Sequence, residues 1–186
     1  MKNLEASSRA TRALHIAADL FKQYGFNKVG VDRIMIETKI PKATFYNYFH
    51  SKERLIEMCL VLQKDQLKEK VRAVCESCQY PDLSLKLRQI YLLHADLKSA
   101  YYLLFKAIFE IEKLYPNAYQ SAVRYRQWLK NEIFSLLMEN KKTASYEESD
   151  IFVFMIDGAI LGRLSSNENE EPDKLLDYFF KDNFLS

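Results

Sequence analysis

Glycine and proline are so scarce in this chain that folds rich in turns are excluded. Its 186 residues contain four glycines and four prolines. Sandwiches, barrels and glycine-rich nucleotide loops need many more of these turn formers. Apolar residues instead recur at helical spacing, beginning at positions i, i+3, i+4 and i+7 with Leu14, Ala17, Ala18 and Phe21. The sequence therefore predicts an all-α chain.

Residues that start and stop helices divide this pattern into segments. Gly25 suits a left-handed cap after the first helix, Pro41 suits the first turn of the third, and Ser51 is a good N-cap for the fourth. The expected helices span residues 8–24, 31–38, 41–48, 51–78, 83–96, 98–114, 117–140, 147–165 and 172–183. The fourth is about 40 Å long at ~1.5 Å per residue, enough to connect two domains. We expect a three-helix head, a long connecting helix and a helical body.

Positive charge is concentrated at the N-terminal end. Residues 1–56 hold ten Lys+Arg and five Asp+Glu, a net charge of +5. Residues 57–186 hold seventeen and twenty, a net charge of −3. This asymmetry favours an anionic partner for the first third of the chain.

The sequence gives no indication of a membrane segment, a secretion signal or a metal site. Charged residues interrupt every stretch before it reaches the ~20 apolar residues that span a bilayer. The N-terminal segment also lacks the continuous apolar core of a signal peptide, so we expect a cytoplasmic protein. Cys75-x-x-Cys78 is half of a zinc motif without a second pair of ligands. We expect neither a metal nor a cofactor.

Residues 31–48 have the layout of a helix-turn-helix, with a tight turn near Lys39-Ile40. A set of apolar residues can hold the second helix of this motif against the first helix of the chain: Ile34, Ile40, Phe45 and Phe49 against Leu14, Ala18 and Phe21. Polar and aromatic residues then remain on its outer face. A helix presented in this way fits the DNA major groove, which is ~12 Å wide and distinguishes all base pairs.

The same segment resembles the TetR family of transcriptional regulators. The resemblance rests on Ala17-x3-Phe21-x3-Gly25-Phe26, on Val31-x2-Ile34, and on the run Pro-Lys-Ala-Thr-Phe-Tyr-Asn-Tyr-Phe-His-Ser-Lys-Glu at residues 41–53. It covers roughly residues 9–56. It implies a DNA-binding domain at residues 7–67, with the helix-turn-helix at residues 30–49. It also implies a C-terminal domain for effector binding and dimerisation at residues 68–186.

By position in the motif, the resemblance implies three kinds of DNA contact. These are groove-facing residues at the start of the recognition helix, base or backbone contacts further along it, and phosphate contacts. The groove-facing residues are Lys42, Ala43 and Thr44. The base or backbone contacts are Tyr46 and Asn47, and the phosphate contacts are Tyr48 and Lys52. A phosphate contact at Lys52 is also expected on physical grounds, because free backbone N–H groups at the start of the fourth helix favour an anion.

Two positions depart from the family pattern. Many members carry a hydroxyl residue that caps the second helix and touches a phosphate, where this chain has Val29-Gly30. A side-chain phosphate contact is not expected there. The turn often contains Gly or Asn, where this chain has Lys39. A left-handed conformation at Lys39 costs about 1 kcal/mol, and its side chain is alternatively within reach of a phosphate.

Residues 151–164 are the expected dimer interface, together with the final helix. One apolar stripe contains Phe154, Gly158 and Leu161, and the next contains Phe152, Met155, Ala159 and Gly162. The final helix carries a further apolar band of Leu175, Leu176, Phe179 and Phe180. Packing within one chain is the alternative, but the resemblance favours a homodimer. A dimer would place two recognition helices on half-sites about 34–36 Å apart, or a multiple, in a pseudo-palindromic operator.

The resemblance also implies an effector that changes the spacing of the two recognition helices and so lowers DNA affinity. A small apolar or aromatic molecule would suit the predicted pocket, which comprises His94, Tyr102, Phe105, Tyr125 and Trp128. The alternative is that these residues form core. The predicted function is a dimeric, ligand-responsive repressor, with activation or dual control left open.

Three other functions were weighed. A redox- or electrophile-sensing regulator would act through Cys59, Cys75 or Cys78. A small helical interaction protein would not bind DNA at all. An enzyme is not expected, because the sequence lacks the common nucleotide-binding, zinc-protease and nucleophile-elbow motifs, and its three histidines lie far apart.

Overall fold

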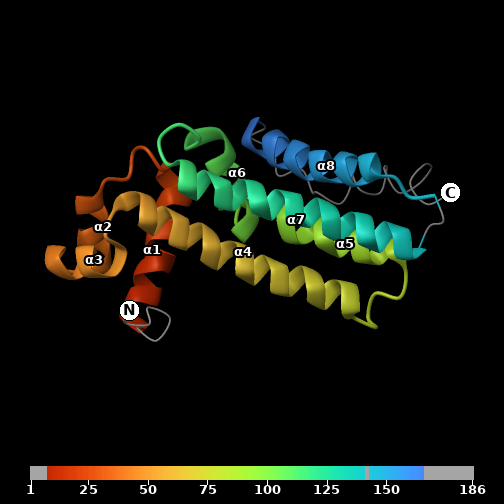
Figure 1. Cartoon of the computed structure of the whole chain (residues 1–186), viewed down its shortest axis with the longest axis horizontal. Coiled ribbons are helices and arrows are strands. Elements are labelled where there is room, and N and C mark those ends of the chain that lie inside the picture. Colours follow the sequence, from red (N-terminus) through yellow and green to blue (C-terminus); the bar gives the residue numbers. More distant parts are fainter. Residues whose placement is uncertain (1–7, 141–142, 166–186) are drawn as a thin grey trace. The chain divides into compact units, whose positions relative to one another are not determined.

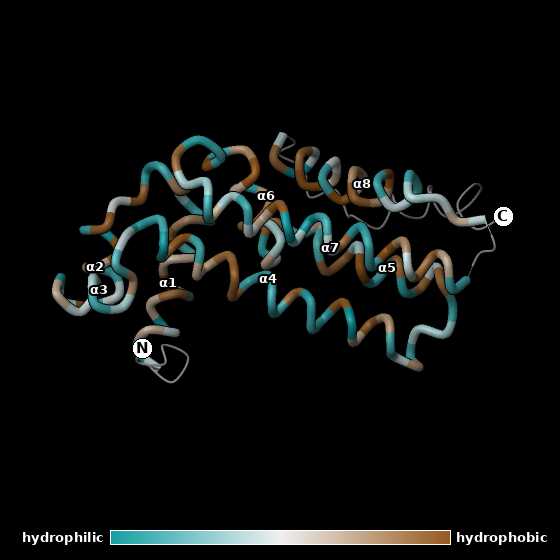
Figure 2. Tube along the Cα trace, viewed as in Figure 1, coloured by the Kyte–Doolittle hydropathy of each residue, from teal (hydrophilic) through white to brown (hydrophobic). Residues whose placement is uncertain are grey.

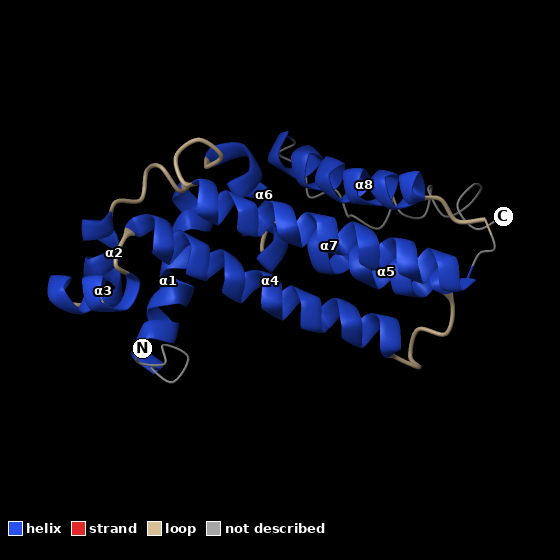
Figure 3. Cartoon of the chain, viewed as in Figure 1, coloured by secondary structure: helices blue, strands red, loops and turns tan. Residues whose placement is uncertain are grey.

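The structure is a computed structural model that describes residues 8–140 and 143–165. Within these ranges every regular element is a helix (Figure 1, Figure 3). The helices are α1 (Ser8–Tyr24), α2 (Val31–Thr38), α3 (Lys42–Phe49), α4 (Lys52–Glu76), α5 (Leu83–His94), α6 (Ala100–Glu110), α7 (Pro116–Asn140) and α8 (Tyr146–Ser165). The predicted all-α fold is confirmed. The helix expected at residues 172–183 lies outside the described residues.

Helix α6 is shorter than its predicted range. It ends at Glu110, whereas the apolar pattern predicted a helix to residue 114. After Glu110 the chain turns, and the N–H of Tyr115 donates to the carbonyl of Ile111 over 2.9 Å. Pro116 then begins α7. Because proline disfavours helical conformation in the preceding residue, one helix does not continue through Tyr115.

The chain forms two compact units. The first joins the residues up to Lys64 with Leu103–Arg124, and the second joins Asp65–Tyr102 with the residues from Tyr125 onward. Helices α4, α6 and α7 each contribute residues to both units. The units group residues by contact, so the expected domain boundary near residue 67 stays a prediction.

Hydrophobic and hydrophilic stretches alternate along the helices, as amphipathic helices require (Figure 2). In the first unit the rings of Phe21 and Phe26 stack with centroids 5.1 Å apart, and those of Phe45 and Phe49 lie 5.2 Å apart. All four are fully buried. Gly25 has a φ of +83°, and its N–H donates to Phe21, so it ends α1 and turns Phe26 back as predicted.

None of the helices that the structure describes is both long enough and apolar enough to cross a membrane.

Candidate nucleic-acid interface

The turn between α2 and α3 is closed by backbone hydrogen bonds. Lys39 adopts a left-handed conformation, with φ 55° and ψ 36°, and its N–H donates to Ile36 over 3.2 Å. The N–H of Ile40 donates to Met35 over 3.2 Å. The left-handed conformation predicted for Lys39 is therefore confirmed. Since backbone bonds hold this turn, the direction in which α3 leaves α2 is well defined.

Helix α3 is anchored on one side and open on the other. Phe45 and Phe49 are fully buried, and Ile34 of α2 is buried as well. The seven predicted DNA-contact residues are exposed or partly exposed: Lys42, Ala43, Thr44, Tyr46, Asn47, Tyr48 and Lys52. Tyr46 is 42% exposed, although its ring lies edge-on to Phe45. The structure thus leaves the predicted face accessible, and DNA contact by these residues stays a prediction.

Helix α4 begins beside the end of α3. The hydroxyl of Ser51 accepts the N–H of Arg54 over 3.0 Å, so Ser51 caps α4 as expected. Lys52 is the first residue of α4, and its Nζ lies 5.5 Å from the ring centroid of Tyr115. His50 has a φ of +61°, which sequence reasoning missed because only a few per cent of non-glycine residues have a positive φ. His50 produces the turn that separates α3 from α4.

The start of α2 has no side-chain cap. Gly30 is its N-cap residue, with extended backbone at φ −80° and ψ 160° and no side-chain hydrogen bond. A Cβ atom added to Gly30 would meet nothing within 4 Å. Gly30 therefore gives α2 no side-chain cap, and the space for a larger residue at this position is open.

The second unit contains a buried histidine. His94 Nδ1 lies 2.6 Å from the carbonyl of Ile90, and Nε2 lies 2.6 Å from the hydroxyl of Tyr125. Because a carbonyl accepts only, Nδ1 carries the proton and Nε2 accepts from Tyr125. Burial lowers the pKa of His94 from 6.5 to about 4. His94 is therefore a neutral ring with both nitrogens satisfied at neutral pH.

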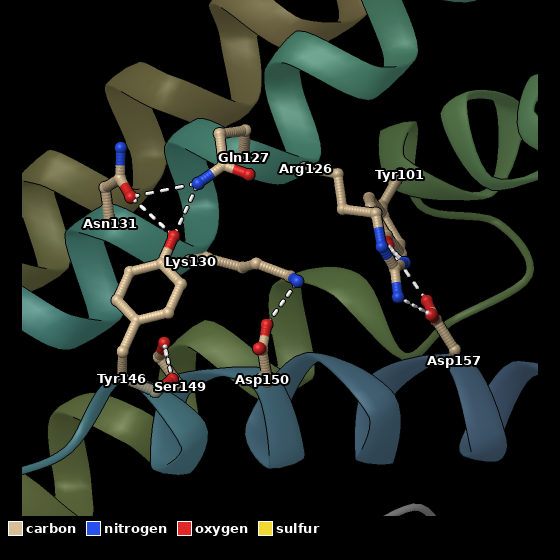
Figure 4. Close-up of polar contacts among 9 residues, drawn as sticks. All are labelled: Tyr101, Arg126, Gln127, Lys130, Asn131, Tyr146, Ser149, Asp150 and Asp157. Atoms are coloured by element: carbon tan, nitrogen blue, oxygen red, sulfur yellow. Dashed lines mark hydrogen bonds and ion pairs between the residues drawn. The ribbon is translucent and has the colours of Figure 1, made fainter.

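A second polar group lies beside this histidine. The ring of Tyr101 packs edge-on to His94 with centroids 5.0 Å apart. Its hydroxyl donates to Asp157 over 2.9 Å and accepts from Arg126 over 3.0 Å, and Arg126 forms an ion pair with Asp157 (Figure 4). Burial, followed by the Asp157 charge, raises the pKa of Tyr101 well above its ordinary value. These contacts connect α6, α7 and α8.

The predicted effector-pocket residues fall in both units. His94, Tyr102, Tyr125 and Trp128 belong to the second unit, and Phe105 belongs to the first. The ring of Trp128 lies 5.6 Å from Tyr125, with Lys68 Nζ 4.7 Å above it. The structure therefore brings His94, Tyr125 and Trp128 together. Their contact with an effector stays a prediction.

The cysteines differ in exposure. The thiol of Cys59 is buried and donates to the carbonyl of Leu14 over 3.4 Å, and burial raises its pKa well above its ordinary range. Burial, with a smaller contribution from Glu132, raises the pKa of the half-buried Cys75 to about 11. Cys78 is exposed. Raised pKa values reduce the thiolate fraction, which is the reactive form.

Helix α8 carries an exposed apolar face. Its members are spaced three or four residues apart, and the four large ones are between 46 and 59% exposed. We define the α8 face as Ile151, Phe154, Gly158, Leu161 and Leu164. A Cβ at Gly158 would meet nothing within 4 Å. Of the second predicted stripe, Phe152 and Ala159 are buried within the chain. The predicted partners at residues 175–180 lie outside the described residues.

Polar contacts beside the α8 face hold α8 to α7 (Figure 4). Lys130 pairs with Asp150. The Tyr146 hydroxyl donates to Asn131 over 2.8 Å and accepts from Gln127. These contacts fix the rotation of α8 about its axis. Arg126 and Lys130 of α7 also border the α8 face, because they lie 5.9 and 5.8 Å from the ring centroid of Phe154.

Comparison with known proteins identifies the N-terminal segment. Residues 13–59 match the family model described as bacterial regulatory proteins, tetR family. The comparison with curated proteins gave no match.

Solved structures of TetR-family regulators match nearly the whole chain. A TetR transcriptional regulator from Legionella pneumophila superposes with a TM-score of 0.78 at 17% identity, covering 96% of this chain and 97% of that one. SCO4454, a TetR-family regulator from Streptomyces coelicolor, gives 0.77 at 22% identity, covering 93% and 85%. E. coli NemR in its reduced form gives 0.77 at 17% identity, covering 93% and 96%. Residues 13–59 therefore match the tetR family model, and the helical fold of the chain is similar to that of solved TetR-family regulators.

Proposed function

We propose that the protein is a dimeric repressor that binds a pseudo-palindromic operator in the cytoplasm and is released by a small apolar or aromatic effector. It would act without a cofactor and without catalysing a reaction. The observation that carries this proposal is the anchored recognition helix. Phe45 and Phe49 hold one side of α3 in the core, while the opposite side leaves Tyr46 and Asn47 accessible.

The rigid anchoring of α3 favours sequence-specific binding. Base readout needs donors and acceptors held in register with the base edges of the major groove. The closed turn at Lys39 and the two buried phenylalanines supply that rigidity. The net charge of +5 on residues 1–56 supplies a sequence-independent attraction to phosphates.

The α8 face supports the proposed homodimer. Contiguous apolar residues on a helix surface mark an interaction site. A second copy is the proposed partner, because a two-fold interface needs a self-complementary patch. Gly158 permits a close approach of two α8 helices, since it has no side chain and no neighbour within 4 Å.

The proposed effector would act on the aromatic core of the second unit. His94, Tyr125 and Trp128 offer a large aromatic surface with few polar atoms, which suits an apolar ligand. A ligand that separated His94 from Tyr125 would have to replace their hydrogen bond. This cost favours effectors that carry one hydrogen-bonding group.

Selection of genomic fragments by the purified protein tests the proposal. We expect a pseudo-palindrome that binds at least ~10³-fold more tightly than a scrambled fragment. Tyr46→Ala should reduce this preference. Lys52→Ala should instead weaken binding to all fragments alike and lower the salt slope by about 1. Equal affinity for the selected and scrambled fragments would refute sequence-specific regulation.

A further inference from the structure

The helix-turn-helix is held at both ends by a segment that lies far along the sequence. Residues 103–124 belong to the same compact unit as α1, α2 and α3. Two hydrogen bonds connect the two parts over sequence separations of 84 and 64 residues. One bond lies just before α2 and the other just after α3, so the segment holds the helix-turn-helix on both sides.

The first of the two attachments, which we call grips, lies just before α2 and consists of Glu110 and Lys106 on one side and Phe26 and Lys22 on the other. A carboxylate oxygen of Glu110 accepts the N–H of Phe26 over 2.9 Å. Lys106 donates to the carbonyl of Lys22 over 3.0 Å and lies 3.5 Å from Glu110. The ammonium of Lys106 thus meets a carbonyl at the negative end of α1, and the carboxylate of Glu110 meets the N–H of Phe26, two residues beyond that end. A Cβ at Gly25 would lie only 2.9 Å from the Glu110 carboxylate, which would have to shift, and the φ of +83° independently favours glycine at this position.

The second grip lies just after α3 and consists of Glu53 and Lys52 on one side and Asn117 and Tyr115 on the other. A carboxylate oxygen of Glu53, in the first turn of α4, accepts the N–H of Asn117 over 3.3 Å. Beside it, the ammonium of Lys52 lies over the ring of Tyr115. Glu53 therefore satisfies a free N–H at the start of α7, and Lys52 contacts the preceding loop.

We propose that residues 106–117 form a positioning element for DNA reading, which fixes the orientation of the helix-turn-helix through these two grips. The proposal rests on the operator binding proposed above and adds residues outside the helix-turn-helix to it. If residues 106–117 held the packed head of α1, α2 and α3 at a single point, the head could pivot about that point as one body. Attachments at Phe26 and at Glu53 remove that freedom.

Electrostatics alone predicts the opposite outcome for Glu110. Removing an anion from a DNA-binding unit strengthens its attraction to phosphates. If Glu110 instead positions the helix-turn-helix, its removal weakens specific binding. Glu112 is a matched control, because it carries the same charge, lies two residues further on, and is exposed.

The experiment compares Glu110→Ala, Glu112→Ala and Glu110→Gln in the full chain. Affinity is measured for the selected operator and for operators whose half-sites are one base pair closer or further apart. We expect Glu110→Ala to weaken operator binding about tenfold, the scale of one charge-assisted hydrogen bond, and to flatten the spacing preference. Glu112→Ala should bind at least as tightly as the unmodified protein. Glu110→Gln keeps an oxygen that can accept the N–H of Phe26, so it should restore the spacing preference.

The inference is overturned if Glu110→Ala matches Glu112→Ala in both affinity and spacing preference. A loss of stability alone would lower affinity for all spacings by one factor, so a uniform loss also counts against it. If Glu110→Ala fails to fold, Lys106→Met tests the same grip, and an unchanged spacing preference refutes the proposal. If the unmodified protein selects no operator, the proposed function itself fails.

Discussion

Acidification should destabilise this protein through one buried side chain. His94 is fully buried and neutral, with Nδ1 donating to Ile90 and Nε2 accepting from Tyr125. Its pKa is about 4 in the folded chain and about 6.5 when exposed by unfolding. Between these values the unfolded chain binds the proton that the folded chain does not. The contribution of neutral His94 to the free energy of unfolding is therefore fully present above pH 6.5 and is lost as the pH falls toward 4.

The size of the effect follows from the two pKa values. Proton binding by the unfolded state lowers the unfolding free energy by about 2 kcal/mol at pH 5 and by about 3 kcal/mol below pH 4. Exposed carboxylates also begin to protonate in this range, so the comparison must be made against a variant that lacks only the imidazole. His94→Gln provides it, because an amide can still donate and accept.

Urea unfolding followed by circular dichroism, at one protein concentration between pH 7.5 and pH 5, measures this contribution. At pH 7.5 the unmodified protein should be more stable than His94→Gln by about 1–3 kcal/mol. That difference should narrow by about 2 kcal/mol at pH 5. His15→Gln, at an exposed position of α1, should keep the full pH dependence. Parallel pH curves for the unmodified protein and His94→Gln would refute the argument.

Three further substitutions test the helix-turn-helix and the dimer. Leu161→Glu places a charge on the α8 face and should convert the proposed dimer to monomers in sedimentation analysis; a dimer that persists in this variant would exclude the α8 face as the interface. Lys39→Gly should be about 1 kcal/mol more stable in urea unfolding than Lys39→Ala, because glycine adopts a φ of 55° without a Cβ penalty, and equal stabilities would contradict the strain assigned to this turn. Gly30→Ser should be about 1 kcal/mol more stable in thermal unfolding than Gly30→Ala, since a hydroxyl can cap α2 and a methyl cannot; no difference would mean that the cap does not form.

Local rules were enough to predict the helix-turn-helix. The left-handed cap at Gly25, the left-handed turn at Lys39 and the N-cap at Ser51 each depend on residues within a few positions in the chain. The buried faces of α2 and α3 follow from helical periodicity in the same way. For these elements the spacing of residue types determines the conformation.

Contacts between distant residues could not be read from the sequence. Nothing near Glu110 indicates that its carboxylate accepts the N–H of Phe26, 84 residues away. The pairing of His94 with Tyr125 likewise depends on how α5 packs against α7. The apolar pattern also continued past the end of α6, because Ile111 and Leu114 keep helical spacing through the turn that Pro116 requires. Long-range polar contacts and helix ends set by packing are therefore known only from the structure.

The first unit is built from two segments that are far apart in the sequence, and this affects when it can fold during translation. Residues 103–124 complete this unit, although its first part ends at Lys64. Ribosomes add about 5–20 residues per second, so synthesis from residue 64 to residue 124 takes about 3–12 s. During that interval the nascent chain lacks both grips on the helix-turn-helix. We expect the growing polypeptide to reach its full operator affinity and spacing preference only after the start of α7 has emerged.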